Sequence, residues 1–359
     1  MIVPAAACAV LAIVGAVVVA ETWTSGTPAP HVAKPMPNPP QVEGKCWDEQ
    51  PFPKPAEAPE LLHLIPTPSG MTLYPELDAE IACSDHTHPL VTFLKRAATG
   101  PEGTLSAALT VTALDGSPQE IAELEVLDNL SPGEDPKSAR IRLPKSTPIT
   151  VRGRPGLLIK QRVLEWQEPG GQWWRVTGSG LTSDQLVVLA AGLTLDRDTM
   201  TWPTAAQQGF EALPIPALPQ GKTVHRWLNL YYTEPGLDLE SVVVSVGLEQ
   251  PWQLLISGMK MPVRLLDVNG QAGVLTENGT LWDMNVPMHD AKTNKSLTQQ
   301  QINALPSRPL VLLETKNGQQ VNISGRVSAP ELLAVAEQLK VASADDPRLA
   351  HANDPPDHR

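Results

Sequence analysis

An internal duplication restricts the fold of this chain more than any other feature of its sequence. Residues 151–158 and 268–275 both follow the pattern Val-x-Gly-x-x-Gly-apolar-Leu. Residues 171–193 match residues 318–339 with one residue of slippage, and the matched positions are Gly178 with Gly325, Thr182 with Ser328, Leu186 with Leu332, and Leu193 with Leu339. Because two separate blocks recur in the same order, the sequence predicts two divergent copies of one folding unit, copy one and copy two.

Each copy begins with a pattern that is typical of antiparallel strands. In Val-x-Gly-x-x-Gly the glycine supplies the positive φ of a tight turn between two strands. In copy one, residues 163–166 and 173–177 lie on either side of a Glu-Pro-Gly-Gly sequence and predict a β-hairpin. Residues 105–114 and 139–143 alternate apolar and polar side chains, which predicts half-buried strands. Three short runs in copy two are expected to be β-rich in the same way: 227–232, 242–246 and 252–256.

A helix is expected at the end of each copy. Ser328 and Glu331 have the spacing of a capping box, and Thr182 or Ser183 with Gln185 can take the same role in copy one. The following apolar residues share one face of each helix: Leu186, Leu189 and Leu193, and Leu332, Val335 and Leu339. The predicted fold class is therefore α+β, with two similar modules that each pack a C-terminal helix on an antiparallel sheet.

The motif that ends each module resembles a known family. The order of strand, turn, strand, tryptophan-containing hairpin and Gly-x-x-Ser-x-x-Glu-Leu-Leu-x-x-Ala-x-x-Leu, best seen in residues 325–339, resembles the C-terminal part of LolA/RseB-like extracytoplasmic modules. Such modules occur in Gram-positive membrane-anchored regulators and lipoproteins of unknown function. The resemblance covers about a third of each module and implies a curved antiparallel sheet with helices on its concave side. It implies binding of lipids or partner proteins without catalysis.

The N-terminus predicts a location outside the cytoplasm. Residues 2–20 carry no charge, and a run of this length can cross a hydrocarbon core of ~30 Å as a helix. No Lys or Arg precedes the run, whereas Val18-Val19-Ala20 offers small residues near a cleavage point. Both an uncleaved anchor with a single span in the cell membrane and a cleaved signal of a secreted protein stay open.

Proline-rich stretches divide the remaining chain. Residues 28–68 contain twelve prolines, and a second proline-rich patch lies at residues 202–220. Proline fixes φ and lacks an amide donor, so these stretches are expected to be extended spacers. The predicted organisation is an anchor or signal (1–22), a linker (23–68), module 1 (69–200), a linker (201–224), module 2 (225–341) and a disordered tail (342–359).

Charge and cysteine content narrow the function. The 27 basic and 39 acidic residues give a net charge of −12, which argues against nucleic acid and anionic membrane surfaces as partners. Cys46 and Cys83 form an even pair in an oxidising compartment, so a disulfide between them is expected. The sequence Cys83-Ser84-Asp85-His86-Thr87-His88 could bind a metal, but Cys83 fits the disulfide better, and no cofactor is predicted.

Motifs for catalysis are missing, which favours binding as the function. The sequence has neither a Gly-x-Ser-x-Gly elbow nor a His-Glu-x-x-His motif. Trp173 and Trp174 must point to opposite faces of their hairpin, so one is core and the other can stack on a sugar or contact a partner, unless both fill the core. The leading hypothesis is a non-catalytic envelope protein that binds a partner protein or a lipid-like ligand. The alternatives are carbohydrate binding and a cell-wall hydrolase.

An insertion in copy two is a second candidate for binding. About thirty residues, roughly 281–308, separate its two matched blocks and have no counterpart in copy one. They include the apolar side chains Trp282, Met284 and Met288. Long loops on rigid scaffolds are the usual place for binding residues. This insertion is therefore expected to contribute the main partner contact.

Overall fold

Antiparallel strands dominate the fold. The computed structural model describes residues 50–51, 53–83, 87–128, 145–196, 199–216, 218, 222–233, 240–247, 250–277 and 308–352. Few helices accompany the strands, so the fold is broadly α+β or mainly β, which agrees with the expected α+β class at this coarse level. The predicted strand at 139–143 lies outside the described residues.

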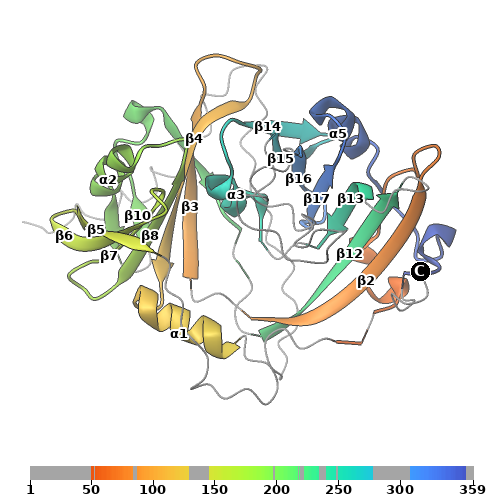
Figure 1. Cartoon of the computed structure of the whole chain (residues 1–359), viewed down its shortest axis with the longest axis horizontal. Helices are drawn as coiled ribbons and strands as arrows, with labels where there is room; N and C mark the ends of the chain where they lie inside the picture. The colour runs from red at the N-terminus through yellow and green to blue at the C-terminus, as the bar shows by residue number, and fades with distance from the viewer. Residues whose placement is uncertain are drawn as a thin grey trace, which may run out of the picture.

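The strands form two runs that meet at one narrow junction (Figure 1). The first sheet half has the order β11 (Phe210–Pro214), β3 (Thr87–Arg96), β4 (Thr104–Leu114), β8 (Trp173–Ser179), β7 (Val163–Gln167), β6 (Arg154–Ile159) and β5 (Ser146–Val151). The second sheet half has the order β2 (Thr72–Cys83), β12 (Lys222–Thr233), β13 (Glu240–Val246), β17 (Gln320–Gly325), β16 (Leu310–Glu314), β15 (Gln271–Thr276) and β14 (Val263–Val268). The halves join where β14 pairs with the start of β4 through Val263–Leu105 and Arg264–Thr104. The sequence predicts one sheet per copy, whereas this short ladder makes the hydrogen bonding continuous.

The repeated glycine pattern forms the β5–β6 and β14–β15 turns. The two central residues of each turn have positive φ: Arg152, Gly153, Asn269 and Gly270. The second glycine of each pattern serves close strand packing instead. A Cβ on Gly156 would lie 2.9 Å from the carbonyl oxygen of Glu165, and a Cβ on Gly273 would lie 2.0 Å from that of Leu312. The pattern therefore needs one glycine for the turn and one for the neighbouring strand.

Both predicted helices are present with the expected caps. In α2 (Ser183–Ala191), Thr182 and Gln185 form a reciprocal capping box, and in α5 (Ala329–Ala336), Ser328 and Glu331 do the same. Helix α2 buries Leu186 and Leu189 in a core that contains Trp166, Trp174 and Trp202. Helix α5 buries Leu332 and Ala336 in the core of the second sheet half. The apolar periodicity thus places each helix on one sheet half.

The expectation of a β-rich run at 252–256 is wrong. These residues form the short helix α3 (Trp252–Leu255), which continues into the 3-10 turn η5 (Ile256–Gly258). Pro251 fixes the entry to the helix, and the four-residue spacing of Trp252 and Ile256 puts both side chains in one apolar cluster. A further helix, α1 (Pro118–Asp128), follows β4.

Polar side chains also hold α3 between the two sheet halves. On the first half, the Thr92 and Thr110 hydroxyls lie 2.7 Å apart, and the Thr92 hydroxyl donates to the carbonyl oxygen of Gln253 at 2.8 Å. On the second half, the Gln253 side-chain amide donates to Glu314 at 3.1 Å. The Gln320 side chain accepts from the backbone N–H of Trp252, also at 3.1 Å. These bonds connect strands of both halves through α3.

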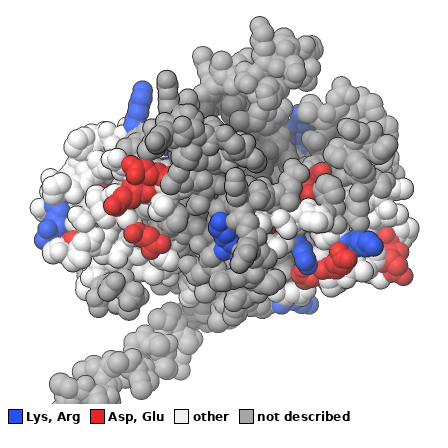
Figure 2. All heavy atoms as spheres, turned by 90° about the horizontal axis from the view of Figure 1, so that it is seen from below, with Lys and Arg blue, Asp and Glu red and all other residues white. Residues whose placement is uncertain are grey.

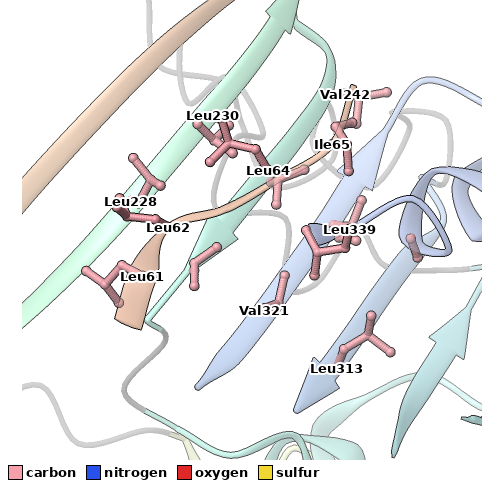
Figure 3. Close-up of a cluster of buried hydrophobic side chains, with 14 of the residues drawn as sticks. Leu61, Leu62, Leu64, Ile65, Leu228, Leu230, Val242, Leu313, Val321 and Leu339 are labelled. Atoms are coloured by element: carbon pink, nitrogen blue, oxygen red, sulfur yellow. The ribbon is translucent and has the colours of Figure 1, made fainter. Parts of the chain in front are cut away.

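The N-terminal arm, residues 53–71, is not the spacer that its prolines suggest. It forms the 3-10 turns η2 (Pro55–Glu57) and η3 (Pro59–Leu61) and the strand β1 (His63–Leu64). Figure 3 shows its apolar side chains inserted among β12, β13, β17 and β16; the buried ones are Ala58, Leu61, Leu62, Leu64 and Ile65. Proline permits extended and 3-10 backbone, so the apolar residues between the prolines can pack into a core.

The expected disordered tail is also partly a packed element. Residues 340–352, the C-terminal strap, include β18 (Lys340–Val341), which pairs with β1, and the 3-10 turn η7 (Pro347–Leu349). The N–H of Ala342 donates to the carbonyl oxygen of Leu62 at 2.7 Å, and Ala352 accepts from the N–H of Leu77 at 3.1 Å. Leu349 and Ala352 are buried in the same core as the arm, which explains why the polar composition of the strap is misleading. Residues 353–359 lie outside the described part of the chain.

Candidate binding site

The tryptophan hairpin has one buried and one half-exposed side chain. Trp174 is 1% exposed and packs with Trp166 under α2, whereas the adjacent Trp173 is half-buried. Opposite orientations follow from the alternation along β8. Trp174 therefore belongs to the core, and Trp173 alone has exposed surface for the predicted sugar or partner contact.

The other predicted binding and disulfide residues lie mostly outside the described part of the chain. This holds for Trp282, Met284, Met288 and Cys46, and for the N-terminal segment 1–22. The backbone of Cys83 ends β2, and its pairing with Cys46 stays a prediction. In the described ranges, no group of three or more His, Cys, Asp or Glu side chains could hold a metal ion. The helices within those ranges are all too short or too polar to span a membrane.

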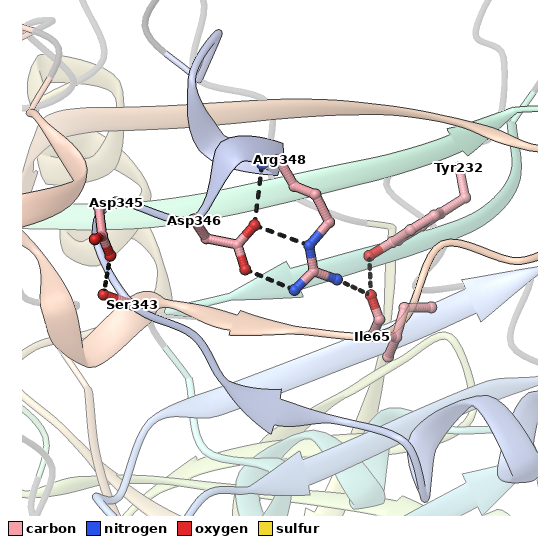
Figure 4. A network of polar contacts seen from close by, with 6 residues as sticks. All are labelled: Ile65, Tyr232, Ser343, Asp345, Asp346 and Arg348. Atoms are coloured by element: carbon pink, nitrogen blue, oxygen red, sulfur yellow. Dashed lines mark hydrogen bonds and ion pairs between the residues drawn. The ribbon is translucent and has the colours of Figure 1, made fainter.

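A polar cluster with shifted pKa values holds the N-terminal arm under the C-terminal strap (Figure 4). Arg348 donates to Asp346 at 2.9 and 2.7 Å and to the carbonyl oxygen of Ile65 at 2.9 Å. The Tyr232 hydroxyl donates to the same carbonyl oxygen at 3.3 Å. Burial raises the pKa of Tyr232 to about 12, and the hydrogen bond from Arg348 lowers the pKa of Asp346. Because these groups satisfy one another and a backbone carbonyl, we interpret the cluster as a structural clamp.

A hollow of about 310 Å³ lies beside α2 in the first sheet half. Its walls come from four separate elements, namely β3, the β8–α2 connection, α2, and the segment in which the 3-10 turn η4 (Ala206–Gln208) leads into β11. The lining residues are Lys95, Leu181, Asp184, Gln185, Val188, Leu189, Gln208 and Phe210. Val188 is 67% exposed, although α2 buries its neighbour Leu189. The hollow therefore has an exposed apolar rim next to a buried wall.

Aromatic packing supports the inner wall of this hollow. The Phe210 ring lies 5.0 Å from the ring of Trp202, which in turn contacts the Phe93 ring edge-on at 4.9 Å, measured between centroids. The Lys95 ammonium group lies 5.5 Å from the Phe210 centroid. This distance is within the range of cation–π attraction. A positive φ of 75° at Gly209 turns the chain from η4 into β11 and so directs Phe210 inwards.

The chemistry of the hollow suits an apolar group with polar atoms around it. Its apolar wall is formed by Leu181, Val188, Leu189 and Phe210, whereas charge and hydrogen-bonding groups come from Lys95, Asp184 and Gln208. Gln185 is already engaged in the helix cap. This combination matches the apolar centre and polar rim of a protein interface. The sequence did not predict this site, because the residues that line it are far apart along the chain. Its one visible sign in the sequence was Val188, an apolar residue of α2 that lies off the helix face formed by the leucines.

One face of the molecule carries both acidic and basic side chains among its described residues. On the face seen in Figure 2, acidic and basic side chains of the described residues lie next to one another on the right of the view.

Comparisons with known proteins supply no family for this chain. No protein-family model matches it, and no curated protein matches it. One solved structure with a weak match is the immunity protein TplEi of the T6SS from Pseudomonas aeruginosa, complexed with an "L" peptide, at 10% sequence identity. The match covers 76% of this chain and 98% of that chain, with a TM-score of 0.15. A TM-score this low supports no argument about fold or function.

Proposed function

We propose that this is a non-catalytic binding protein of the cell envelope, which residues 1–22 hold at the membrane or, if cleaved, direct to secretion. Among the described residues, its binding site is the hollow beside α2, and its ligand is an apolar side chain of a partner protein. The insertion at residues 281–308 stays a proposed second contact. The observation that carries the proposal is the exposed Val188 at the rim of a hollow whose inner wall is the buried Phe210. Concave sites with apolar walls and a few polar groups are typical of binding sites.

A protein partner fits the hollow better than a lipid-like ligand does. The hollow is open, and about 310 Å³ is at the lower end of the range for small-molecule pockets. The amide of Gln208 and the charges of Lys95 and Asp184 can pair with the backbone or polar side chains around an inserted apolar residue. Carbohydrate binding by Trp173 and a hydrolase function remain alternative outcomes.

We also propose that the two sheet halves are copies of one module of the LolA/RseB-like kind. The strand order supports this proposal. Numbered along the chain from β3 and from β12, both halves have the spatial order 1-2-6-5-4-3, and a capped helix follows the sixth strand in each. The matched glycine turns also occupy the same place, between the third and fourth strands.

The experiment is a pull-down from the native envelope with the full chain and two matched variants. Val188→Glu introduces a charge at the rim of the hollow, and Ala334→Glu introduces it at the equivalent exposed position of α5. Both should change the free energy of unfolding by only about 0.5 kcal/mol. We expect Val188→Glu to reduce capture of the partner at least tenfold and Ala334→Glu to leave it unchanged.

Three results would contradict the proposal. Capture by Val188→Glu at the wild-type level would exclude the hollow, and equal loss in both variants would indicate a non-specific charge effect. Lipid extraction of the purified protein provides the third result. If the wild type binds a lipid and Val188→Glu does not, the ligand of the hollow is lipid-like and not a protein.

A further inference from the structure

Two edge strands pair with strands that are distant in the sequence, although a near neighbour is available to each. Only residues 84–86 separate β2 from β3, yet β2 pairs with β12. Residues 215–221 separate β11 from β12, yet β11 pairs with β3. In Figure 1, β2 accordingly runs along β12 on the right, while β3 lies in the other sheet half. Strand β2 therefore completes the second sheet half, although the strand that follows it, β3, belongs to the first. Strand β11 completes the first sheet half, although the strand that follows it, β12, belongs to the second.

The segments before these two strands also share a sequence pattern. Residues 65–71 read Ile-Pro-Thr-Pro-Ser-Gly-Met, and residues 202–210 read Trp-Pro-Thr-Ala-Ala-Gln-Gln-Gly-Phe. Both follow apolar-Pro-Thr, then a connection, then Gly-apolar. The first apolar residue, Ile65 or Trp202, is buried in its core, and the glycine has a φ of 81° at Gly70 and 75° at Gly209. An edge strand starts directly afterwards in both cases.

The short strands before these segments are equivalent as well. Strand β10 (Thr199–Thr201) pairs antiparallel with β9 (Thr194–Asp196), which follows α2. Strand β1 pairs antiparallel with β18, which follows α5. The order of short strand, apolar-Pro-Thr, glycine and edge strand therefore occurs twice, at β1–β2 and at β10–β11. The first occurrence directly precedes β3 in the sequence, and the second directly precedes β12.

We infer that the two copies exchange their N-terminal strand pairs. Copy one begins at β1 and copy two begins at β10, so the duplication extends beyond the two blocks that the sequence shows. Strands β1–β2 of copy one complete the second sheet half, where β2 and β12 form twelve residue pairs. Strands β10–β11 of copy two complete the first sheet half, where β11 and β3 form five.

The acceptor surface is of the same kind in both halves. It consists of the free edge of the first strand of the copy, β3 or β12, together with the short strand that follows the helix, β9 or β18. An edge strand presents unpaired N–H and C=O groups, which a further strand can satisfy. The partner that this surface fits is therefore a strand pair with the apolar-Pro-Thr and Gly-apolar pattern, supplied by the other copy.

The exchange makes the candidate hollow a site shared by both copies, a consequence that rests on the proposed function. Lys95 and helix α2 come from copy one, whereas Gln208 and Phe210 come from the strand pair of copy two. Without that strand pair, the hollow would lose its aromatic inner wall. The exchange itself depends only on the strand pairing and on the repeated pattern.

Disulfide trapping in the full chain tests the exchange without measuring partner capture. Cys8, Cys46 and Cys83 are first replaced by serine. Tyr74→Cys with Tyr231→Cys tests the exchanged register, in which Tyr74 and Tyr231 are opposite each other. Tyr74→Cys with Arg96→Cys tests a local β2–β3 hairpin, in which positions 74 and 96 would be opposite each other across the 84–86 connection. The disulfides are identified by peptide mapping without reduction.

We expect an intrachain disulfide in most molecules of the 74–231 variant and in few molecules of the 74–96 variant. The reverse result, or no disulfide in either variant, would overturn the exchange. A 74–231 disulfide found only between two chains would also overturn it, because the strand pair would then be exchanged between molecules. Failure of the Val188→Glu pull-down would leave all these outcomes unaffected.

Discussion

The two sheet halves are completed in different ways. Every strand of the first half lies between Thr87 and Pro214, so one continuous segment supplies it. The second half needs β2 and the N-terminal arm from one end of the chain and the C-terminal strap from the other. The comparison teaches that the same strand order can be completed from within one continuous segment or by segments that precede and follow the other strands of the half. In both cases burial, not sequence position, identifies the completing segment.

The largest expected effect concerns the core of the first half. Trp174→Ala should lower the free energy of unfolding by about 3–5 kcal/mol, because it removes a fully buried side chain from under α2. Trp173→Ala is the matched control on the neighbouring, half-exposed position and should cost about 1 kcal/mol or less. Guanidinium unfolding followed by circular dichroism measures both. Equal losses would show that the two tryptophans are not divided between core and surface.

A smaller effect is expected for the arm that closes the second half. Ile65→Ala should lower the free energy of unfolding by about 2–4 kcal/mol, because Ile65 is buried among strands of the second half. Thr67→Ala, two residues further on and exposed, should stay within about 0.5 kcal/mol. Urea denaturation of both variants gives the comparison. A negligible effect of Ile65→Ala would mean that the arm is a spacer, as its proline content suggests.

Mild acid should destabilise the second half more than the first. Burial lowers the pKa of His63 on β1 and of His225 on β12, so the unfolded chain binds protons at a higher pH than the folded protein does. The free energy of unfolding should therefore fall as the pH drops below about 6.5 and be fully present above it. Urea midpoints between pH 7.5 and 5.5 measure this fall. His63→Gln should make it shallower, and an unchanged slope would contradict the assignment to His63.

The smallest effect is expected in the polar clamp. Tyr232→Phe removes one hydrogen bond to the carbonyl oxygen of Ile65, but Arg348 still donates to that oxygen. The free energy of unfolding should therefore fall by about 0.5–1.5 kcal/mol. Thermal unfolding at neutral pH measures the change. A loss as large as that of Ile65→Ala would show that the hydroxyl, and not apolar packing, holds the arm.

Local features of this fold were predictable from sequence, and long-range pairing was not. The capping pairs Thr182–Gln185 and Ser328–Glu331 and the positive φ at Gly153 and Gly270 depend on residues a few positions apart. Alternation along the strand predicts that Trp173 and Trp174 point to opposite faces of the sheet, but it does not identify the strands with which β8 pairs. Periodicity determines which side of a strand is buried, but it does not determine which edge that strand will join.

The arm and the hollow were missed for the same physical reason. Prolines at 55, 59 and 66 make the arm read as an extended spacer, although apolar residues lie between them. These apolar residues are buried only because they pack on β12 and β17, which are more than 150 residues away in sequence. The hollow likewise joins Lys95, Val188 and Phe210 from three separate elements. The repeat of apolar-Pro-Thr followed by Gly-apolar was visible in the sequence, but only the strand pairing gives it a meaning.

Cleavage of both connections between the halves tests the exchange most directly. The full chain, with an N-terminal affinity tag, receives specific protease sites at residues 84–86 and 219–221, which yields an N-terminal piece that ends with β2, a middle piece and a C-terminal piece. The cleaved protein is bound through its tag and washed with increasing urea. The account predicts that the C-terminal piece is retained to a higher urea concentration than the middle piece, because β2 and the arm belong to the second sheet half. Release of the C-terminal piece together with or before the middle piece would contradict it.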